Sequence, residues 1–249
     1  MEPLYGDDFY QDRAADTLPS YEIIVSKLIE WLHPKSVVDV GCGIGAALSL
    51  FQKKGVPVVL GIEGPWIKRN YLLIAEKDLL IQDLSQPFQI SQKFDLALSI
   101  EVAEHLPENA ADHFVEHLTK LAPVIVFAAA IPGQGGIGHV NEQWPEYWCG
   151  KFERQGFEKV DCLREIFWLI PEVKFCSKQN LFLYRKKGST PQITASANHS
   201  LLSQAVHRDL YEEILRGFTS ALEGSIRRFS VEQLTQEMIR RTKKKITRK

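Results

Sequence analysis

The chain has 249 residues, of which 45% are hydrophobic and 24% charged, a composition typical of a globular protein with one domain and an appendage. Its formal net charge of −1 excludes a general attraction of the whole molecule for nucleic acid. Four cysteines without CxxC or metal-ligand spacing, and no signal-peptide or membrane-helix pattern, lead us to expect a cytoplasmic protein with free thiols and no transmembrane segment.

Hydrophobic runs alternate with segments of helical periodicity from about residue 20 to residue 130. A helix is predicted over residues 21–32, where apolar residues recur at helical spacing and Pro34 follows. Short apolar runs predict strands over 36–40, 56–62, 79–82, 94–100 and 124–130. Between them, helices are predicted over 44–54, 66–75 and 109–121. Because strands and helices alternate, we expect a parallel sheet with right-handed crossovers.

The remaining predicted elements complete a Rossmann-like α/β fold. Residues 131–144 form a Gly-rich loop directly after a strand, where such folds place substrate. A helix over 145–155 and strands over 157–162 and 180–185 follow, which gives a seven-stranded, mostly parallel sheet in a three-layer domain. We divide the chain into an N-terminal lid segment (1–19), the main domain (20–187), a polar linker (188–200) and a helical, basic C-terminal extension (201–249).

The C-terminal extension differs from the rest of the chain in its charge. Residues 191–249 contain 11 Lys and Arg against 6 Asp and Glu, so the remainder of the chain is acidic. From Leu202 to Phe229, apolar residues recur at three- and four-residue steps, which predicts a long amphipathic helix. We expect its apolar stripe to pack on the main domain, on a second copy in a homodimer, or on a partner protein. The basic end is interpreted as a solvated helix end, with an anionic surface as the alternative.

A glycine-rich turn after the first predicted strand carries the chemistry of a nucleotide-type site. Gly41, Gly43 and Gly45 allow positive φ angles and a close approach of ligand to backbone. Glu63 lies 22 residues after Gly41, where a carboxylate can accept both hydroxyls of a ribose. The glycines alone also fit a dinucleotide fingerprint. Asp39 favours a different ligand, because its carboxylate would repel a pyrophosphate and suits a cationic sulfonium or its amino group.

Four motifs together resemble class I S-adenosylmethionine-dependent methyltransferases. VVDVGCGIGAAL resembles their first motif, GIEGP their second, Asp83-Leu84 the adenine-binding acidic position, and FDLALSIEVAEHLPE the fourth-strand motif. The resemblance covers about residues 20–185. It implies S-adenosylmethionine as cofactor, with Trp66 able to shelter the adenine. The implied cofactor-binding residues are Asp39, Gly41, Gly43, Gly45, Glu63, Asp83, Leu84 and Glu101.

The sequence ExxEH, from Glu101 to His105, is similar to a motif in two metal-dependent branches of this family. These are the catechol O-methyltransferases of the ubiquinone pathway and the small-RNA 2′-O-methyltransferases. The resemblance implies a divalent metal held by Glu101, Glu104, His105 and His139, the last with Glu142 nearby. In the alternative without metal, Glu101 contacts the cofactor, Glu104 caps a turn and His105 is the general base, with His139 as a further candidate for base or ligand. Glu104, His105 and His139 are therefore the predicted catalytic residues.

The aromatic residues of the sequence bear on the kind of acceptor. Aromatic residues at both borders of the expected cleft favour a flat or sugar-like substrate, namely Tyr5, Phe9, Tyr10, Trp144, Tyr147 and Trp148. His113 and His117, four residues apart, are expected on a solvated helix face. We expect O-methylation of a small-molecule or glycan hydroxyl. An RNA 2′-hydroxyl is the alternative, made less favourable by the acidic body. A non-catalytic cofactor-binding interaction module and a nicotinamide oxidoreductase are the other two classes considered.

Overall fold

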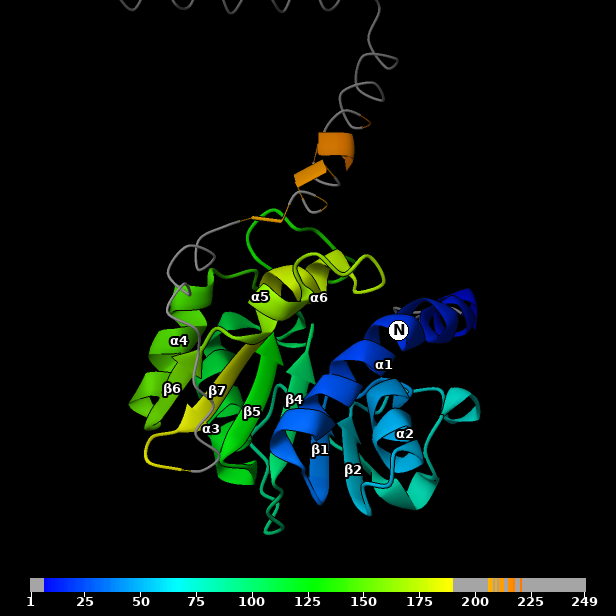
Figure 1. Cartoon of the computed structure of the whole chain (residues 1–249), viewed down its shortest axis with the longest axis vertical. Helices are drawn as coiled ribbons and strands as arrows, with labels where there is room; N and C mark the ends of the chain where they lie inside the picture. The colour runs from blue at the N-terminus through cyan, green and yellow to red at the C-terminus, as the bar shows by residue number, and fades with distance from the viewer. Residues whose placement is uncertain are drawn as a thin grey trace, which may run out of the picture. The chain divides into compact units, whose positions relative to one another are not determined.

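The apolar runs of the sequence form one seven-stranded sheet within residues 7–189 of the computed structural model (Figure 1). Its strand order is β3-β2-β1-β4-β5-β7-β6, and β7 runs antiparallel to both of its neighbours. The strands are β1 Ser36–Val40, β2 Val58–Glu63, β3 Leu79–Ile81, β4 Leu96–Ile100, β5 Val124–Ala128, β6 Phe157–Val160 and β7 Phe182–Lys186. The predicted Rossmann-like, mostly parallel seven-stranded fold is confirmed.

The structure describes residues 7–189, 206, 207, 209, 211, 212, 215–217 and 220, with side chains from residue 17 onward. The helices of the main domain are α1 Asp7–Leu32, α2 Ala46–Lys53, α3 Ala111–Leu121, α4 Pro145–Arg154, α5 Leu163–Phe167 and α6 Phe175–Asn180. None of the helices in this described part is both long and apolar enough to cross a membrane.

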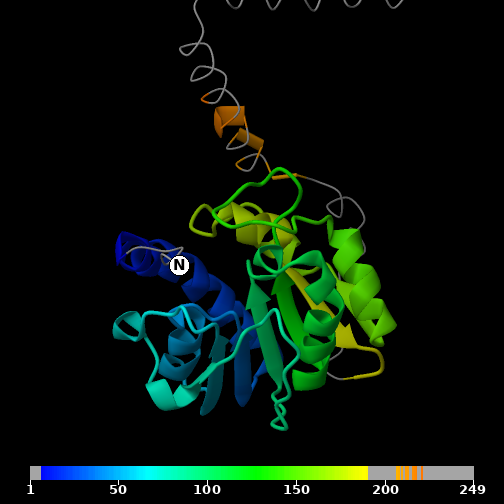
Figure 2. The ribbon, with the colours of Figure 1, turned by 180° about the vertical axis from the view of Figure 1, so that it is seen from behind.

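Both faces of the sheet are covered, which gives the three-layer architecture (Figures 1 and 2). Successive residues of a strand point to opposite faces, so Val37 joins the core beneath α1 and α2, whereas Val38 joins the core beneath α3 and α4. The central strands β4 and β5 are buried along their whole length. This burial explains why they are continuous apolar runs without a polar alternation.

The helix expected over residues 66–75 is wrong. The chain instead forms two short 3₁₀ turns, η1 Arg69–Tyr71 and η2 Glu76–Asp78. The N–H of Leu73 donates to the carbonyl of Ile44 at 2.8 Å, and the side chain of Ile74 packs beside Gly45. Contacts with the start of α2 therefore replace the hydrogen bonds that a local helix would have made.

The N-terminal helix and the segment between β6 and β7 also differ from the expectation. The helix expected over 21–32 is the second half of α1, which includes Pro19 and crosses the expected end of the lid segment. The helices α5 and α6, which the periodicity did not reveal, lie between β6 and β7. Asn180, expected at the start of the last strand, ends α6.

The chain divides into two compact units, residues 1–207 and residues 208–249. The first unit ends on a buried residue, His207, whose backbone N–H donates to Gln179 Oε1 at 2.6 Å. Its Nε2 lies 2.8 Å from the carbonyl oxygen of Trp168. In the second unit, residues 209, 211, 212, 215–217 and 220 are helical. Most of the predicted linker, most of the long helix from Leu202 to Phe229 and the basic end of the extension lie outside the described residues.

Candidate active site

The glycine-rich turn joins the end of β1 to α2. Gly41, Gly43 and Gly45 have φ angles of 83°, 53° and 79°, a region that side chains rarely adopt. A Cβ at Gly41 would collide with Val102, and one at Gly45 would lie 2.8 Å from Ile74. At Gly43, by contrast, nothing lies within 4 Å of the Cβ position. Two of the glycines are thus required by packing as well as by φ, and the third leaves space for a ligand to approach the backbone.

Two carboxylates, Asp39 and Glu63, meet beside this turn at the ends of adjacent parallel strands. The Glu63 carboxylate accepts the N–H of Gly43 and the N–H of Gly64, each at 2.7 Å. Burial, and secondarily the charge of Glu63, raise the pKa of Asp39 from 3.8 to about 7. A pair of buried carboxylates disfavours an anionic ligand here and favours a cationic one.

The residues expected around an adenine have three different environments in the structure. Asp83 Oδ1 accepts the backbone N–H and the hydroxyl of Ser85, at 2.9 and 2.7 Å, and so stabilises its own turn. Leu84 is a buried core residue. The Trp66 indole is half exposed and lies where a Cβ of Gly64 would be, directly after Glu63. Trp66 is therefore a surface aromatic close to the carboxylate pair.

His113 and His117 do not lie on a solvated face, so that expectation is wrong. His113 Nε2 lies 3.0 Å from the carbonyl oxygen of Ser85. The buried His117 accepts the N–H of Phe88 at 3.3 Å through Nε2, and its burial lowers its pKa. The two rings attach the segment after Asp83 to α3. Their role is structural support of the loop expected to bind adenine.

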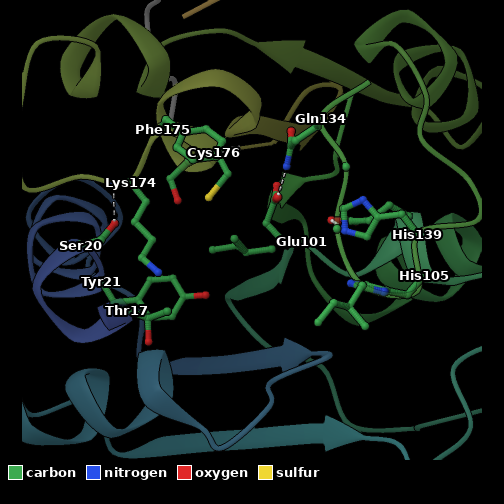
Figure 3. Close-up of a pocket in the computed structure, with 16 residues that line it drawn as sticks. Thr17, Ser20, Tyr21, Glu101, His105, Gln134, His139, Lys174, Phe175 and Cys176 are labelled. Atoms are coloured by element: carbon green, nitrogen blue, oxygen red, sulfur yellow. Dashed lines mark hydrogen bonds and ion pairs between the residues drawn. The ribbon is translucent and has the colours of Figure 1, made fainter. Parts of the chain in front are cut away.

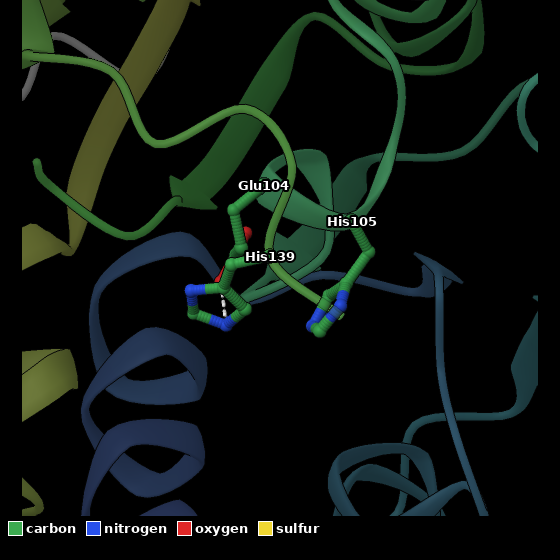
Figure 4. A group of neighbouring side chains, drawn as sticks. All are labelled: Glu104, His105 and His139. Carbon is green, nitrogen blue, oxygen red and sulfur yellow. Dashed lines mark ion pairs between the residues drawn. The ribbon is translucent and has the colours of Figure 1, made fainter. Parts of the chain in front are cut away.

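Three of the four expected metal ligands come together after β4 (Figure 4). Glu104, His105 and His139 each offer a ligand atom, and these atoms lie within 4.8 Å of one another. The Glu104 side chain is fully buried, and His139 Nε2 lies 4.0 Å from its Oε1. The Glu104 carbonyl accepts the N–H groups of Val140 and Asn141, at 2.9 and 3.0 Å. These backbone bonds attach the Gly-rich loop after β5 to the ExxEH turn.

A second carboxylate orients His139. The Nδ1 atom of His139 lies 2.9 Å from Glu142 Oε1. The Glu142 carboxylate also accepts the N–H groups of Gly133 and Gly135. Partial burial raises the pKa of Glu142. The hydrogen bonds from His139 and from the two glycines lower it by more, with that from His139 the largest of them, so the pKa of Glu142 lies below its ordinary value. An ionised Glu142 requires the proton of neutral His139 to be on Nδ1, so Nε2 carries the lone pair. In the sequence, the only indication of this role for Glu142 is its position close to His139.

Glu101 is directed away from the three-residue cluster. Its Oε2 accepts Gln134 Nε2 at 2.8 Å, and its Oε1 accepts Asn180 Nδ2 at 3.2 Å. The set of four expected metal ligands is therefore only partly assembled, with Glu101 outside the cluster of Glu104, His105 and His139. Neither Gln134 nor Asn180 was singled out in the sequence, because neither belongs to a recognisable motif.

A cavity of about 460 Å³ opens beside these groups (Figure 3). Its walls come from α1, the end of β4, the ExxEH turn, the Gly-rich loop and the segment that begins α6; the polar and aromatic lining includes Thr17, Tyr21, Glu101, His139, Lys174 and Phe175. Trp144, Tyr147 and Trp148, expected at one border of the cleft, do not line this cavity, and Trp148 is a core residue packed on Phe127. The side chains of Tyr5, Phe9 and Tyr10 lie outside the described residues.

Comparison with known proteins gives a family and a fold. A family model described as a methyltransferase domain matches residues 24–161. A protein of Haemophilus influenzae is 25% identical over 213 residues, which cover 80% of this chain and 78% of that protein. A probable chloroplastic tocopherol O-methyltransferase of Oryza sativa subsp. japonica is 38% identical over 98 residues, 36% of this chain and 26% of that protein. Magnesium protoporphyrin IX methyltransferase from Synechocystis PCC 6803 superimposes with a TM-score of 0.51 at 18% identity, over 74% of this chain and 91% of that chain.

Proposed function

The chain belongs to the methyltransferase-domain family, and from that premise we propose that it methylates a hydroxyl oxygen of a small-molecule or glycan acceptor. Membership makes the protein an S-adenosylmethionine-dependent methyltransferase of the class I, Rossmann-like type. Family membership also selects S-adenosylmethionine over a dinucleotide, the two ligands between which the glycine turn alone did not discriminate. The observation that carries the choice of a hydroxyl acceptor is the Glu142–His139 pair, in which Glu142 contacts Nδ1 and His139 lines the cavity.

The residues of the glycine turn fit S-adenosylmethionine. The open side at Gly43 and the adjacent carboxylates of Asp39 and Glu63 suit a ligand that carries positive charge and hydroxyl donors. Within this proposal, Gly41 and Gly45 shape the turn, Glu63 receives the ribose, Asp39 the amino group, and Asp83 with Leu84 the adenine. When bound, the cofactor supplies an electrophilic methyl group on a sulfonium.

The acceptor hydroxyl must lose its proton as its oxygen is methylated. His139 Nε2 is the base that we assign to this step, because Glu142 fixes the tautomer that leaves this nitrogen able to accept a proton. The buried Glu104 carboxylate, 4.0 Å from Nε2, would stabilise the imidazolium that forms. His105, whose ring centre is 4.8 Å from that of His139, would position the acceptor.

A divalent metal is the second candidate for activating the hydroxyl. Glu104, His105 and His139 fit such an ion, since one carboxylate and two imidazoles match Mn²⁺, Fe²⁺ or Zn²⁺ better than Mg²⁺. Glu142 would be the outer carboxylate that orients His139. A bound cation there would lower the pKa of the acceptor hydroxyl.

Calorimetric titration with S-adenosylhomocysteine, followed by transfer of labelled methyl from S-adenosylmethionine to hydroxyl acceptors, tests the proposed function. We expect micromolar binding and label that is stable as an ether. Label found only on nitrogen or carbon atoms of the product would contradict O-methylation.

Cofactor affinity is expected to rise with pH through about 7, where Asp39 titrates in the free protein. The raised pKa of Asp39 means that the folded protein favours the neutral carboxyl group. The contribution of Asp39 to stability is therefore present below pH 3.8 and is lost as the pH rises through about 7. A cationic ligand requires the ionised form, so binding near pH 6 must release a proton. Calorimetry in two buffers of different ionisation enthalpy measures this proton. Heats that agree between the buffers would contradict the assignment of Asp39.

The cluster of Glu104, His105 and His139 is expected to bind one Co²⁺, detected by visible absorption bands and reversed by EDTA. The variants Glu104→Gln and His139→Ala should each weaken this binding, because the first removes the negative charge of a ligand and the second removes a ligand nitrogen. Glu108→Gln, an exposed acid close in sequence, is the matched control. Co²⁺ binding that is equal in all four proteins would rule out this cluster. Methyl transfer that resists EDTA would leave His139 as a base acting without metal.

A further inference from the structure

Glu101 occupies a backbone conformation that side chains rarely adopt. Its φ angle is 56°, at the end of β4, and its N–H donates to the carbonyl of Ala128 on β5. Glycine would satisfy this conformation more easily, so a glutamate here places its side chain against local backbone preference. Such residues concentrate at sites where the direction of a side chain matters for function.

Two amides from distant parts of the chain hold its carboxylate. Gln134, from the Gly-rich loop, donates to Oε2, and the buried Asn180, at the end of α6, donates to Oε1. Asn180 also donates to Gln134 Oε1 at 2.8 Å, which fixes the orientation of the glutamine amide. Each carboxylate oxygen can accept more than one hydrogen bond, so a ligand donor can join each of these amides.

The carboxylate faces the cavity. Figure 3 shows Glu101 between Tyr21 and Lys174 on one side and His105 and His139 on the other. Hydroxyl-bearing residues of α1, Thr17, Ser20 and Tyr21, line the same cavity. Together with Glu101, these hydroxyls can bind several hydroxyls of one acceptor at once, which favours a polyol over a flat aromatic molecule with one or two hydroxyls.

We propose that Glu101 binds the acceptor by accepting hydrogen bonds from two neighbouring hydroxyls of a saturated, polyhydroxylated molecule such as a sugar or a cyclitol. This inference rests on the proposed O-methylation and names its acceptor class. In this proposal, Glu101 contacts neither the cofactor nor a metal ion. Gln134 and Asn180 are positioning residues, which act on the acceptor only through the Glu101 carboxylate.

Saturation-transfer NMR on the full chain loaded with S-adenosylhomocysteine tests this assignment, with methyl α-D-glucopyranoside, myo-inositol and catechol as probes. We expect at least one polyol to bind more tightly than catechol, and Glu101→Gln to weaken polyol binding at least tenfold. The exposed Glu108→Gln is the control and should bind all probes as the wild type does. S-adenosylhomocysteine affinity should be unchanged in both variants, which also shows that they are folded.

The positioning role has its own test in a double-mutant cycle. Gln134→Ala should weaken polyol binding in the wild-type background and have no further effect in the Glu101→Gln background, because its effect passes through that carboxylate. Equal effects in both backgrounds would assign Gln134 a purely structural role and overturn that part of the inference.

Three results would overturn the acceptor assignment. They are no polyol binding to the loaded wild type, tighter binding of catechol, or loss of S-adenosylhomocysteine affinity in Glu101→Gln. Methyl transfer to catechol but not to polyols would refute this inference and leave the proposed O-methylation intact. Failure to transfer methyl to any oxygen would refute the proposed function itself.

Discussion

The variant His139→Ala is expected to transfer methyl about 10²–10⁴-fold more slowly than the wild type, the range for loss of a general base. The reason is geometric: Glu142 lies 2.9 Å from Nδ1, which leaves the lone pair of neutral His139 on Nε2, and His139 lines the cavity. Initial rates with labelled S-adenosylmethionine, at saturating acceptor, measure the loss in kcat.

Two companion variants make this prediction specific. Glu142→Gln keeps a hydrogen-bond acceptor but removes the charge that fixes the tautomer, so its loss should be smaller than that of His139→Ala. His33→Asn changes an exposed histidine away from the site and should leave the rate unchanged; asparagine tolerates the φ of 45° at this position. Affinity for S-adenosylhomocysteine should be preserved in all three variants. A His139→Ala rate within threefold of the wild type would exclude His139 as base and as essential metal ligand.

The variant Glu63→Ala is expected to weaken S-adenosylhomocysteine binding by about 1.5–3 kcal/mol for each hydrogen bond lost from the ribose hydroxyls. Loss of even one such bond means an affinity decrease of at least about tenfold. The same change leaves the N–H groups of Gly43 and Gly64 without the carboxylate that aligns them, so the turn is also less well preorganised. Calorimetric titration at pH 8, where Asp39 is mostly ionised in the free protein, isolates the effect of Glu63.

A pH series separates the loss of Glu63 from general damage to the fold. Glu63 is the second cause of the raised pKa of Asp39, so Glu63→Ala should lower that pKa and shift the pH dependence of cofactor binding to lower pH. Glu76→Ala, an exposed glutamate on η2, is the control and should change neither affinity nor its pH profile. Unchanged affinity in Glu63→Ala would show that the ribose is bound elsewhere.

Local patterns sufficed for the sheet and the glycine turn. The central strands β4 and β5 are continuous apolar runs, and the three glycines follow a strand within a few residues, so both features are visible in short stretches of sequence. The segment 66–75 shows the opposite case. Its pattern suits a helix, but hydrogen bonding to Ile44 and packing of Ile74 beside Gly45 decide its conformation. The burial of His113 and His117 likewise depends on the segment that returns after Asp83.

For the site, the sequence by itself determined the class of protein, the cofactor turn and the three residues Glu104, His105 and His139, because each belongs to a short motif or follows a strand end. Only the tertiary structure decided that Glu142 orients His139 and that Glu101 turns to Gln134 and Asn180. It also decided that polar residues of α1 and of the segment leading into α6 complete the cavity wall. These contacts join residues up to 154 positions apart, as in the hydrogen bond from the N–H of Lys174 to Ser20 Oγ. Their geometry depends on how loops and helices pack at the edge of the sheet, and no local periodicity encodes that packing.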